Sequence, residues 1–130
     1  MRTRLLPPAL LLALVACSAP VASQAPSSDA SESATGEATA IDVMDFMIEP
    51  SVLEVAGPTV TIEVTNDGPT PHNLTVRDAA GIVVMNTEDL SAGDTATISA
   101  ELEPGEYTIF CALPGHESLG MSGNLTVIAP

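Results

Sequence analysis

The chain has 130 residues, of which 17 are Asp or Glu and only three are Lys or Arg, so its formal net charge is −14. The basic residues are Arg2, Arg4 and Arg77, and there is no lysine. This composition argues against a nucleic-acid partner and against docking on anionic lipid head groups, because both need clustered basic side chains. The length fits one domain once any targeting segment is removed.

Residues 1–16 have the features of a signal peptide. Two arginines precede an apolar stretch, residues 5–16, which is shorter than the roughly 20 residues of a membrane-spanning helix. The stretch ends in Leu-Val-Ala before Cys17, which resembles the lipobox of bacterial lipoproteins, where the cysteine is lipidated and becomes the new N-terminus. We therefore expect an exported, extracytoplasmic, membrane-anchored lipoprotein with its lipid on Cys17. An ordinary secretory signal cleaved near Ala16 or Ala19 is the alternative.

The following segment, residues 17–40, consists mainly of Ser, Ala, Thr, Glu, Pro and Gly. Such a segment buries too little apolar surface to offset the entropy lost on folding, so we expect a disordered linker. Residues 41–130 then form the single folded domain, which is small but long enough to fold alone.

The two cysteines are Cys17 and Cys111. If Cys17 carries lipid, Cys111 has no partner within the chain, and a lone thiol in an oxidising compartment is either a liability or a ligand. A disulfide between the two is the alternative, and it would tie the far end of the linker to the domain.

The domain is predicted to be all-β. Apolar and polar residues alternate in several short runs, and Gly, Pro, Asn and Asp cluster between them as turn signals. Many short strands at this spacing favour a β-sandwich. The runs are residues 59–66, 72–77, 94–102, 106–111 and 125–127.

The same alternation orients two side chains that can bind metals. His72 shares a strand face with Leu74 and Val76, and Cys111 shares one with Ile109. Because residues two apart on a strand point to the same side, both side chains should face the core. Each lies at the end of its predicted run, so we expect a site within one end of the sandwich.

The C-terminal part of the domain contains Cys111, His116 and Met121 in the pattern Cys-x4-His-x4-Met, and His72 lies upstream. Thiolate and thioether are soft ligands and imidazole is borderline. Two His, one Cys and a weak axial Met form the ligand set of blue-copper electron-transfer sites. Singly, each residue is ordinary core packing, but the chain's only two histidines and the domain's only cysteine all fall in the pattern. We predict one type 1 copper ion that alternates between Cu(I) and Cu(II).

Met44 and Met47 could be imagined as extra thioether ligands for copper delivery. Met44 and Met47 are three residues apart, so on one strand they would face opposite sides, and packing is the better interpretation for both and for Met85.

The residues around this pattern closely resemble the cupredoxins, the family of plastocyanin, azurin, amicyanin and their lipoprotein relatives. The resemblance covers nearly the whole domain, from Asp45-Phe46 through Val127, and it includes Asn66 and residues 71–76, 105–111 and 114–127. It implies a Greek-key β-sandwich, the cupredoxin fold, with copper ligands at four positions. These are His72, Cys111, His116 and Met121.

The resemblance also implies roles for neighbouring residues. Asn73 would tie the strand of the first histidine to the cysteine loop, and His116 would be the ligand nearest to solvent. An apolar ring would surround it and suit brief contacts with redox proteins. The ring would consist of Leu113, Pro114, Gly115, Leu119 and Pro69.

The function expected from these features is a monomeric carrier that shuttles single electrons between extracytoplasmic redox proteins. Its partner would be a cytochrome or an oxidoreductase, and the acidic charge would suit a basic one. The alternative is a copper-binding or delivery protein without a redox partner, which needs a more open site. An enzyme is not expected, because copper oxidases and nitrite reductases need further histidines. A copper-free adhesion domain is disfavoured by the ligand set.

Overall fold

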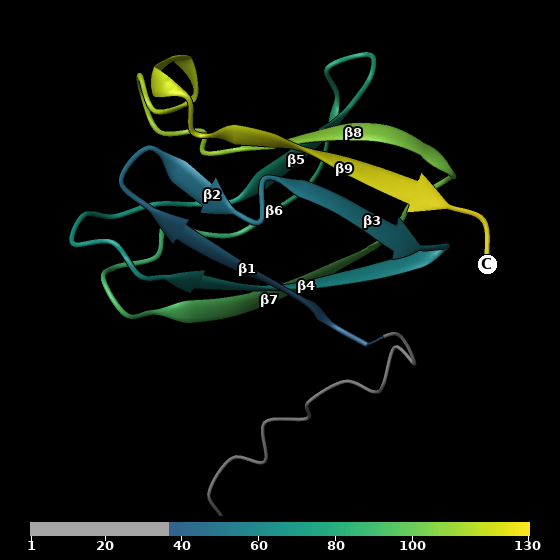
Figure 1. Cartoon of the computed structure of the whole chain (residues 1–130), viewed down its shortest axis with the longest axis horizontal. Helices are drawn as coiled ribbons and strands as arrows, with labels where there is room; N and C mark the ends of the chain where they lie inside the picture. Colours follow the sequence, from purple (N-terminus) through teal and green to yellow (C-terminus); the bar gives the residue numbers. More distant parts are fainter. Residues whose placement is uncertain (1–36) are drawn as a thin grey trace, which may run out of the picture. The chain divides into compact units, whose positions relative to one another are not determined.

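The computed structural model describes residues 37–130, which form two β-sheets packed face to face (Figure 1). The predicted signal segment, residues 1–16, Cys17 and most of the predicted linker, residues 17–40, lie outside this range. The last two residues of that linker, 39 and 40, belong to the first strand, so the folded domain begins slightly earlier than predicted. Within it, the helical element is a single 3-10 turn, Glu117–Leu119, and no helix is long and apolar enough to cross a membrane.

The first sheet has four strands in the order β2-β1-β4-β7. β1 runs antiparallel to β2 and parallel to β4, and β4 pairs antiparallel with β7. The inward residues of β4 are fully or almost fully buried against the other sheet. The strands are β1 (Thr39–Met44), β2 (Met47–Glu49), β4 (Thr59–Asn66) and β7 (Thr95–Glu101).

The second sheet has five strands in the order β3-β9-β8-β5-β6. β9 pairs in parallel with β3, and the other neighbours are antiparallel. A side chain at Gly123 of β9 would clash with the residue that precedes β3, because a Cβ atom there would lie 2.3 Å from the carbonyl oxygen of Ser51. The strands are β3 (Val52–Ala56), β5 (Thr75–Asp78), β6 (Val83–Asn86), β8 (Gly105–Phe110) and β9 (Ser122–Ile128).

The all-β sandwich predicted from the alternation is confirmed, but one strand begins later than expected. The run 72–77 becomes β5 only from Thr75. His72 instead forms an isolated bridge with Leu90, in which its N–H donates to the Leu90 carbonyl at 3.1 Å and its own carbonyl accepts at 2.7 Å. The inward direction predicted for His72 and Cys111 is confirmed, since both residues are fully buried.

The hairpin formed by β1 and β2 corrects the interpretation of two methionines. Met44 and Met47 are register partners across a two-residue turn, Asp45-Phe46, so they face the same side of the sheet rather than opposite sides. The turn contains Asp45 but no Gly, Pro or Asn, and the sequence did not predict it. Phe46 takes the φ angle of +59°, in the left-handed region that residues other than glycine rarely occupy.

Three connections meet at one end of the sandwich. The β1–β2 turn, the loop after β4 and the loop between β8 and β9 lie together on the left in Figure 1, and the C-terminus lies at the opposite end. Segments far apart in the sequence thus come together where the predicted ligands lie.

Candidate metal centre

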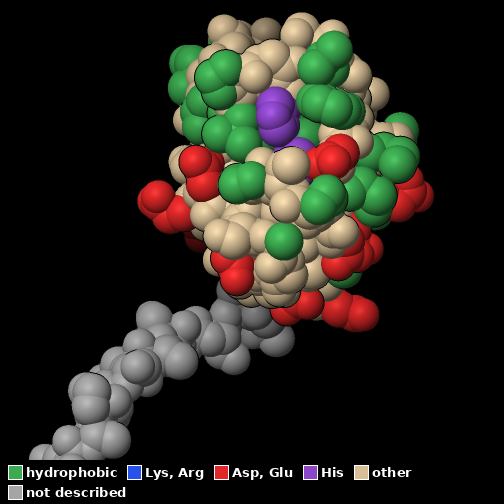
Figure 2. Space-filling model, turned by 90° about the vertical axis from the view of Figure 1, so that its left-hand side faces the viewer, with side chains coloured by type: hydrophobic (Ala, Val, Ile, Leu, Met, Phe, Trp, Pro, Cys, Tyr) green, Lys and Arg blue, Asp and Glu red, His purple; other side chains and the backbone are tan. Residues whose placement is uncertain are grey.

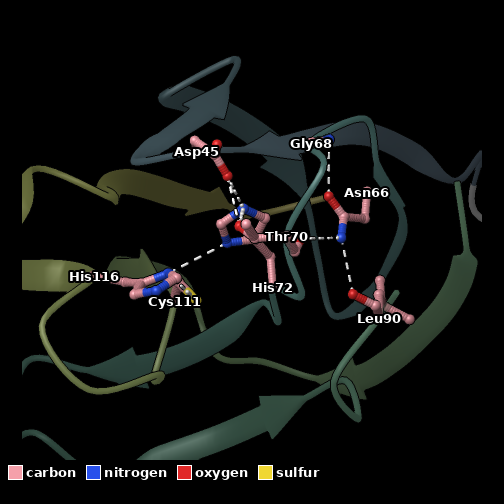
Figure 3. A network of polar contacts seen from close by, with 8 residues as sticks. All are labelled: Asp45, Asn66, Gly68, Thr70, His72, Leu90, Cys111 and His116. Carbon is pink, nitrogen blue, oxygen red and sulfur yellow. Dashed lines mark hydrogen bonds and ion pairs between the residues drawn. The ribbon is translucent and has the colours of Figure 1, made fainter. Parts of the chain in front are cut away.

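His72 is held by a loop that the buried side chain of Asn66 organises. The Asn66 amide nitrogen donates to the carbonyls of Thr70 and Leu90, each at 2.8 Å, and its oxygen accepts from the Gly68 N–H at 2.9 Å (Figure 3). Because Leu90 is also the bridge partner of His72, this network fixes the backbone segments of both residues beside the imidazole.

The other predicted ligands lie on one loop closed by backbone hydrogen bonds. Cys111 directly follows β8, and its N–H donates to the carbonyl of Met121 at 3.1 Å. The N–H of Met121 donates in turn to the carbonyl of His116, also at 3.1 Å. Met121 is therefore joined to both other residues by its main chain, and its side chain is fully buried.

The side chains of three of the four predicted ligands converge. His72 Nδ1 lies 3.2 Å from His116 Nδ1, and Cys111 Sγ lies 3.6 Å from that same nitrogen (Figure 3). The donor atoms of all three residues lie within 4.8 Å of one another. Within residues 37–130, Cys111 forms no disulfide bond.

These separations fit a small transition-metal ion. Two donors bound to one such ion, at about 2.0 Å for nitrogen and about 2.3 Å for sulfur, lie a little over 3 Å apart. The buried Met121 side chain, on the same loop as Cys111 and His116, favours copper, because thiolate and thioether together are soft ligands. The arrangement is consistent with one type 1 copper site.

Asn73 links the two parts of this centre. Its side-chain oxygen accepts from the N–H of Ala112, the residue after Cys111, at 2.8 Å. Its amide nitrogen donates to Asp89 at 2.8 Å. The residue after His72 is thereby bound to the residue after Cys111.

Arg77, the one basic residue among residues 37–130, braces the same loop from β5. Its guanidinium forms a two-pronged ion pair with Glu117, the residue after His116, and lies 4.3 Å from the ring centre of Phe110, the residue before Cys111. The hydrogen bond to the Glu117 carboxylate raises the pKa of Arg77. The paired carboxylate offsets the positive charge that Arg77 presents to a partner.

Two contacts of the histidines were not foreseen from the sequence. Asp45 accepts a hydrogen bond from Thr70 at 2.6 Å and lies 3.1 Å from His72 Nε2 (Figure 3). These hydrogen bonds, that of Thr70 first, lower the pKa of the Asp45 carboxyl group. The ring of Phe46 stands edge-on to His116 with centroids 5.3 Å apart. The family resemblance begins at Asp45-Phe46 but gave these residues no role at the site, since the contacts join segments at least 25 positions apart.

The surface over this end of the domain combines apolar side chains with carboxylates. Figure 2 shows imidazole atoms at the surface, with apolar side chains around them and carboxylates just below them in this view. His116 is partly exposed, while Phe46 is 45% and Leu119 63% exposed. Of the apolar ring expected here, Pro114 and Pro69 are exposed and Leu113 is partly buried.

Comparison with known proteins places this geometry in a family. A model of the cupredoxin-like domain matches residues 9–127. Among curated protein sequences, none matches the chain significantly.

Three solved structures share the fold. A dithionite-reduced auracyanin from the photosynthetic bacterium Roseiflexus castenholzii has a TM-score of 0.63 at 21% identity, covering 70% of this chain and 96% of that one. Auracyanin B has a TM-score of 0.66 at 19% identity, covering 75% and 93%. A purple cupredoxin from Nitrosopumilus maritimus has a TM-score of 0.53 at 25% identity, covering 69% and 99%. With a family match over most of its length and a shared fold, the chain belongs to the cupredoxin-like family.

Proposed function

We propose that the protein is a blue-copper electron carrier that exchanges single electrons between extracytoplasmic redox proteins. The observation that supports this most directly is the convergence of His72 Nδ1, His116 Nδ1 and Cys111 Sγ within 4.8 Å. Met121 would complete the ligand set as a weak axial donor. Copper, when bound, would supply reversible exchange of one electron.

The chain's own residues would keep the site constant during that exchange. Asn73, Arg77 and the backbone bonds of Met121 hold the loop and the His72 segment in one arrangement. Burial of His72 and Cys111 keeps water from those ligands, while partial exposure of His116 leaves one ligand edge near a partner. Fixed ligands limit reorganisation, so an electron can pass without a large conformational change.

A copper-binding or delivery protein without a redox partner is the second candidate. The buried donors disfavour it, since delivery needs a ligand set that opens readily to a receiving protein. A catalytic role is also disfavoured. Both histidines of the chain, His72 and His116, are already committed to the proposed centre and cannot build a second copper site.

Titration of the metal-free protein with Cu(II) tests this function. We expect one equivalent to bind and produce an intense visible absorption from the thiolate–copper bond, followed by reversible one-electron voltammetry. Binding without the visible band would argue for another metal site, and a band without a reversible wave would favour storage or delivery. Absence of binding would overturn the proposal.

We further propose that the partner is basic and that the acidic surface guides it. Residues 17–130 contain 17 carboxylates against a single arginine, and that arginine is paired with Glu117. Complementary charge raises association rates and is screened by salt, with a Debye length of about 10 Å at 0.1 M. Electron transfer to a basic c-type cytochrome should slow by about tenfold or more as salt rises from about 10 mM to about 200 mM. An acidic cytochrome serves as the control and should not slow, and a salt-independent rate with the basic protein would contradict electrostatic guidance.

We also propose that lipid on Cys17 anchors the protein to the outer side of a membrane. The lipobox-like sequence before Cys17 supports this. The Cys17→Ala variant, expressed with its full signal segment, should move from the membrane fraction to the soluble fraction, and mass spectrometry should show loss of an acylated N-terminal peptide. Ser18→Ala, one residue further, is the control and should remain membrane-bound. Persistent membrane association of Cys17→Ala would exclude the anchor.

A further inference from the structure

The turn Asp45-Phe46 at the tip of the β1–β2 hairpin touches both histidines of the proposed centre. Asp45 contacts His72, and Phe46 contacts His116. The hairpin belongs to the four-stranded sheet, whereas the loop that carries Cys111 and His116 joins strands of the other sheet. Two adjacent residues thus reach across the sandwich end and contact two ligands that are 44 positions apart.

The contacts of Asp45 determine which nitrogen of His72 carries the proton. The hydroxyl of Thr70 donates its single hydrogen to Asp45 at 2.6 Å, so towards His72 Nε2, at 3.2 Å, its oxygen can only accept. The ionised carboxylate of Asp45, 3.1 Å from the same Nε2, also only accepts. Both neighbours therefore require a hydrogen on Nε2. In the neutral imidazole the lone pair is then on Nδ1, the nitrogen that faces His116 and the thiol.

A carboxylate behind a metal-bound histidine does more than orient the ring. Accepting the hydrogen bond from the far nitrogen raises the basicity of the nitrogen that binds the metal. A more basic ligand favours the more highly charged Cu(II) over Cu(I), and so does the negative charge itself. Asp45 should therefore strengthen Cu(II) binding and lower the reduction potential.

Phe46 adopts a backbone conformation that is unfavourable for an aromatic residue, with φ of +59°. Strain of this kind persists where surrounding contacts demand it, and it accumulates at functional sites. Its ring is 45% exposed, so core burial does not explain the conformation. Its edge-on contact with His116, at 5.3 Å between centroids, restricts rotation of the ligand that is nearest to solvent.

We propose that the Asp45-Phe46 turn is a positioning element for the copper centre, in which Asp45 fixes the tautomer of His72 and strengthens its donor nitrogen, and Phe46 braces the ring of His116. This inference rests on the proposed copper site. The turn acts through the two histidines and is assigned no contact with the metal.

The Asp45→Asn variant tests the first half. Asn suits the turn as well as Asp does, so the fold should persist, but the charged acceptor is lost. Outer contacts of this kind typically change metal affinity by about 10-fold to 100-fold. We expect Cu(II) affinity to fall by about tenfold with Cu(I) affinity little changed, which corresponds to a rise of about 59 mV in the potential of this one-electron couple.

The Asp67→Asn variant is the matched control for charge. Asp67 is exposed in the loop that leads to His72, and its removal also deletes one negative charge without touching an imidazole. Its potential should shift much less than that of Asp45→Asn. Equal shifts in the two variants would show that Asp45 acts only as a surface charge and would overturn this half.

The tautomer has a readout that needs no copper. Two-bond ¹H–¹⁵N correlation spectra of the metal-free protein, at a pH where the imidazoles are neutral, should show His72 protonated at Nε2. Asp45→Ala should convert it to a tautomer mixture. If His72 of the wild-type protein carried its proton on Nδ1, the role assigned to the turn would be refuted. If His72 had the expected tautomer but the protein bound no Cu(II), the copper site would be refuted and, with it, the role of the turn in positioning a ligand.

Phe46→Gly tests the second half, because glycine accepts the positive φ while the ring is removed. The metal-free variant should keep a thermal midpoint close to that of the wild type, yet a chelator should extract Cu(II) from it several-fold faster. Val52→Gly, which removes another exposed apolar side chain in β3, should leave the extraction rate unchanged. An extraction rate for Phe46→Gly equal to the wild type would show that the ring does not brace His116.

Discussion

Replacing Cys111 with serine should abolish the intense visible absorption of the copper-loaded protein. The colour of a blue-copper site arises from its thiolate–copper bond, and the domain has no other cysteine to supply one. A serine hydroxyl is a hard, neutral ligand at physiological pH and cannot replace the soft thiolate. Loss of an outer contact to a metal ligand typically costs about 10-fold to 100-fold in metal affinity, and loss of a ligand itself should cost more. We therefore expect loss of the band and a fall in Cu(II) affinity of at least about 100-fold.

The same variant should remain folded, so that the loss can be assigned to chemistry. Serine is close to cysteine in size and shape, so the exchange opens only a small cavity. The cost of burying the hydroxyl should then stay within about 1–3 kcal/mol of unfolding free energy. Far-UV circular dichroism and urea denaturation check this. Cys17→Ser makes the same exchange at the chain's other cysteine and should keep the full absorption; a strong visible band in Cys111→Ser would refute the assigned thiolate.

The sequence predicted the central strands well because their alternation is regular. Residues 59–66 coincide with β4, whose inward Val60, Ile62 and Val64 are buried in the core. Residues 106–111 correspond to β8 within one residue. Here the period of two is imposed by burial of one face, and burial is what the amino-acid pattern records.

Prediction failed where long-range pairing rather than local pattern decides the structure. The sequence did not predict β1, β2, β3 and β6, in which apolar and polar residues do not alternate over a long run. The start of β5 was misplaced because His72 pairs with Leu90, a contact 18 positions away that no local period encodes.

The prediction of the candidate centre also succeeded only in part. His72, Cys111, His116 and Met121 were predicted because their donor atoms form a recognisable chemical set, and three of them prove to converge. Asp45 and Phe46 were not, although each touches a histidine. The resemblance includes Asp45 and Phe46 but assigns them no role, and only the β1–β2 hairpin brings them to the site.

Replacing Met121 with leucine should leave copper bound and raise the reduction potential. A thioether donor stabilises Cu(II) more than an alkyl group does, so its removal disfavours the oxidised state, and the axial ligand is a recognised determinant of the potential. A tenfold change in relative affinity equals 59 mV for one electron, and we expect a rise of roughly 60–120 mV. Voltammetry of the copper-loaded variant measures it directly.

The fold should tolerate this exchange, because Leu and Met have similar volumes and such swaps usually cost less than about 1.5 kcal/mol. The main chain of residue 121, which holds the loop between Cys111 and His116, is untouched. Met85 provides the matched control, since it is also buried in the core but lies on β6, outside the proposed ligand set. Met85→Leu should leave the potential unchanged. If Met121→Leu left the potential equal to or below the wild type, its thioether would not be the axial donor, and the fourth ligand of the centre would have to be sought elsewhere.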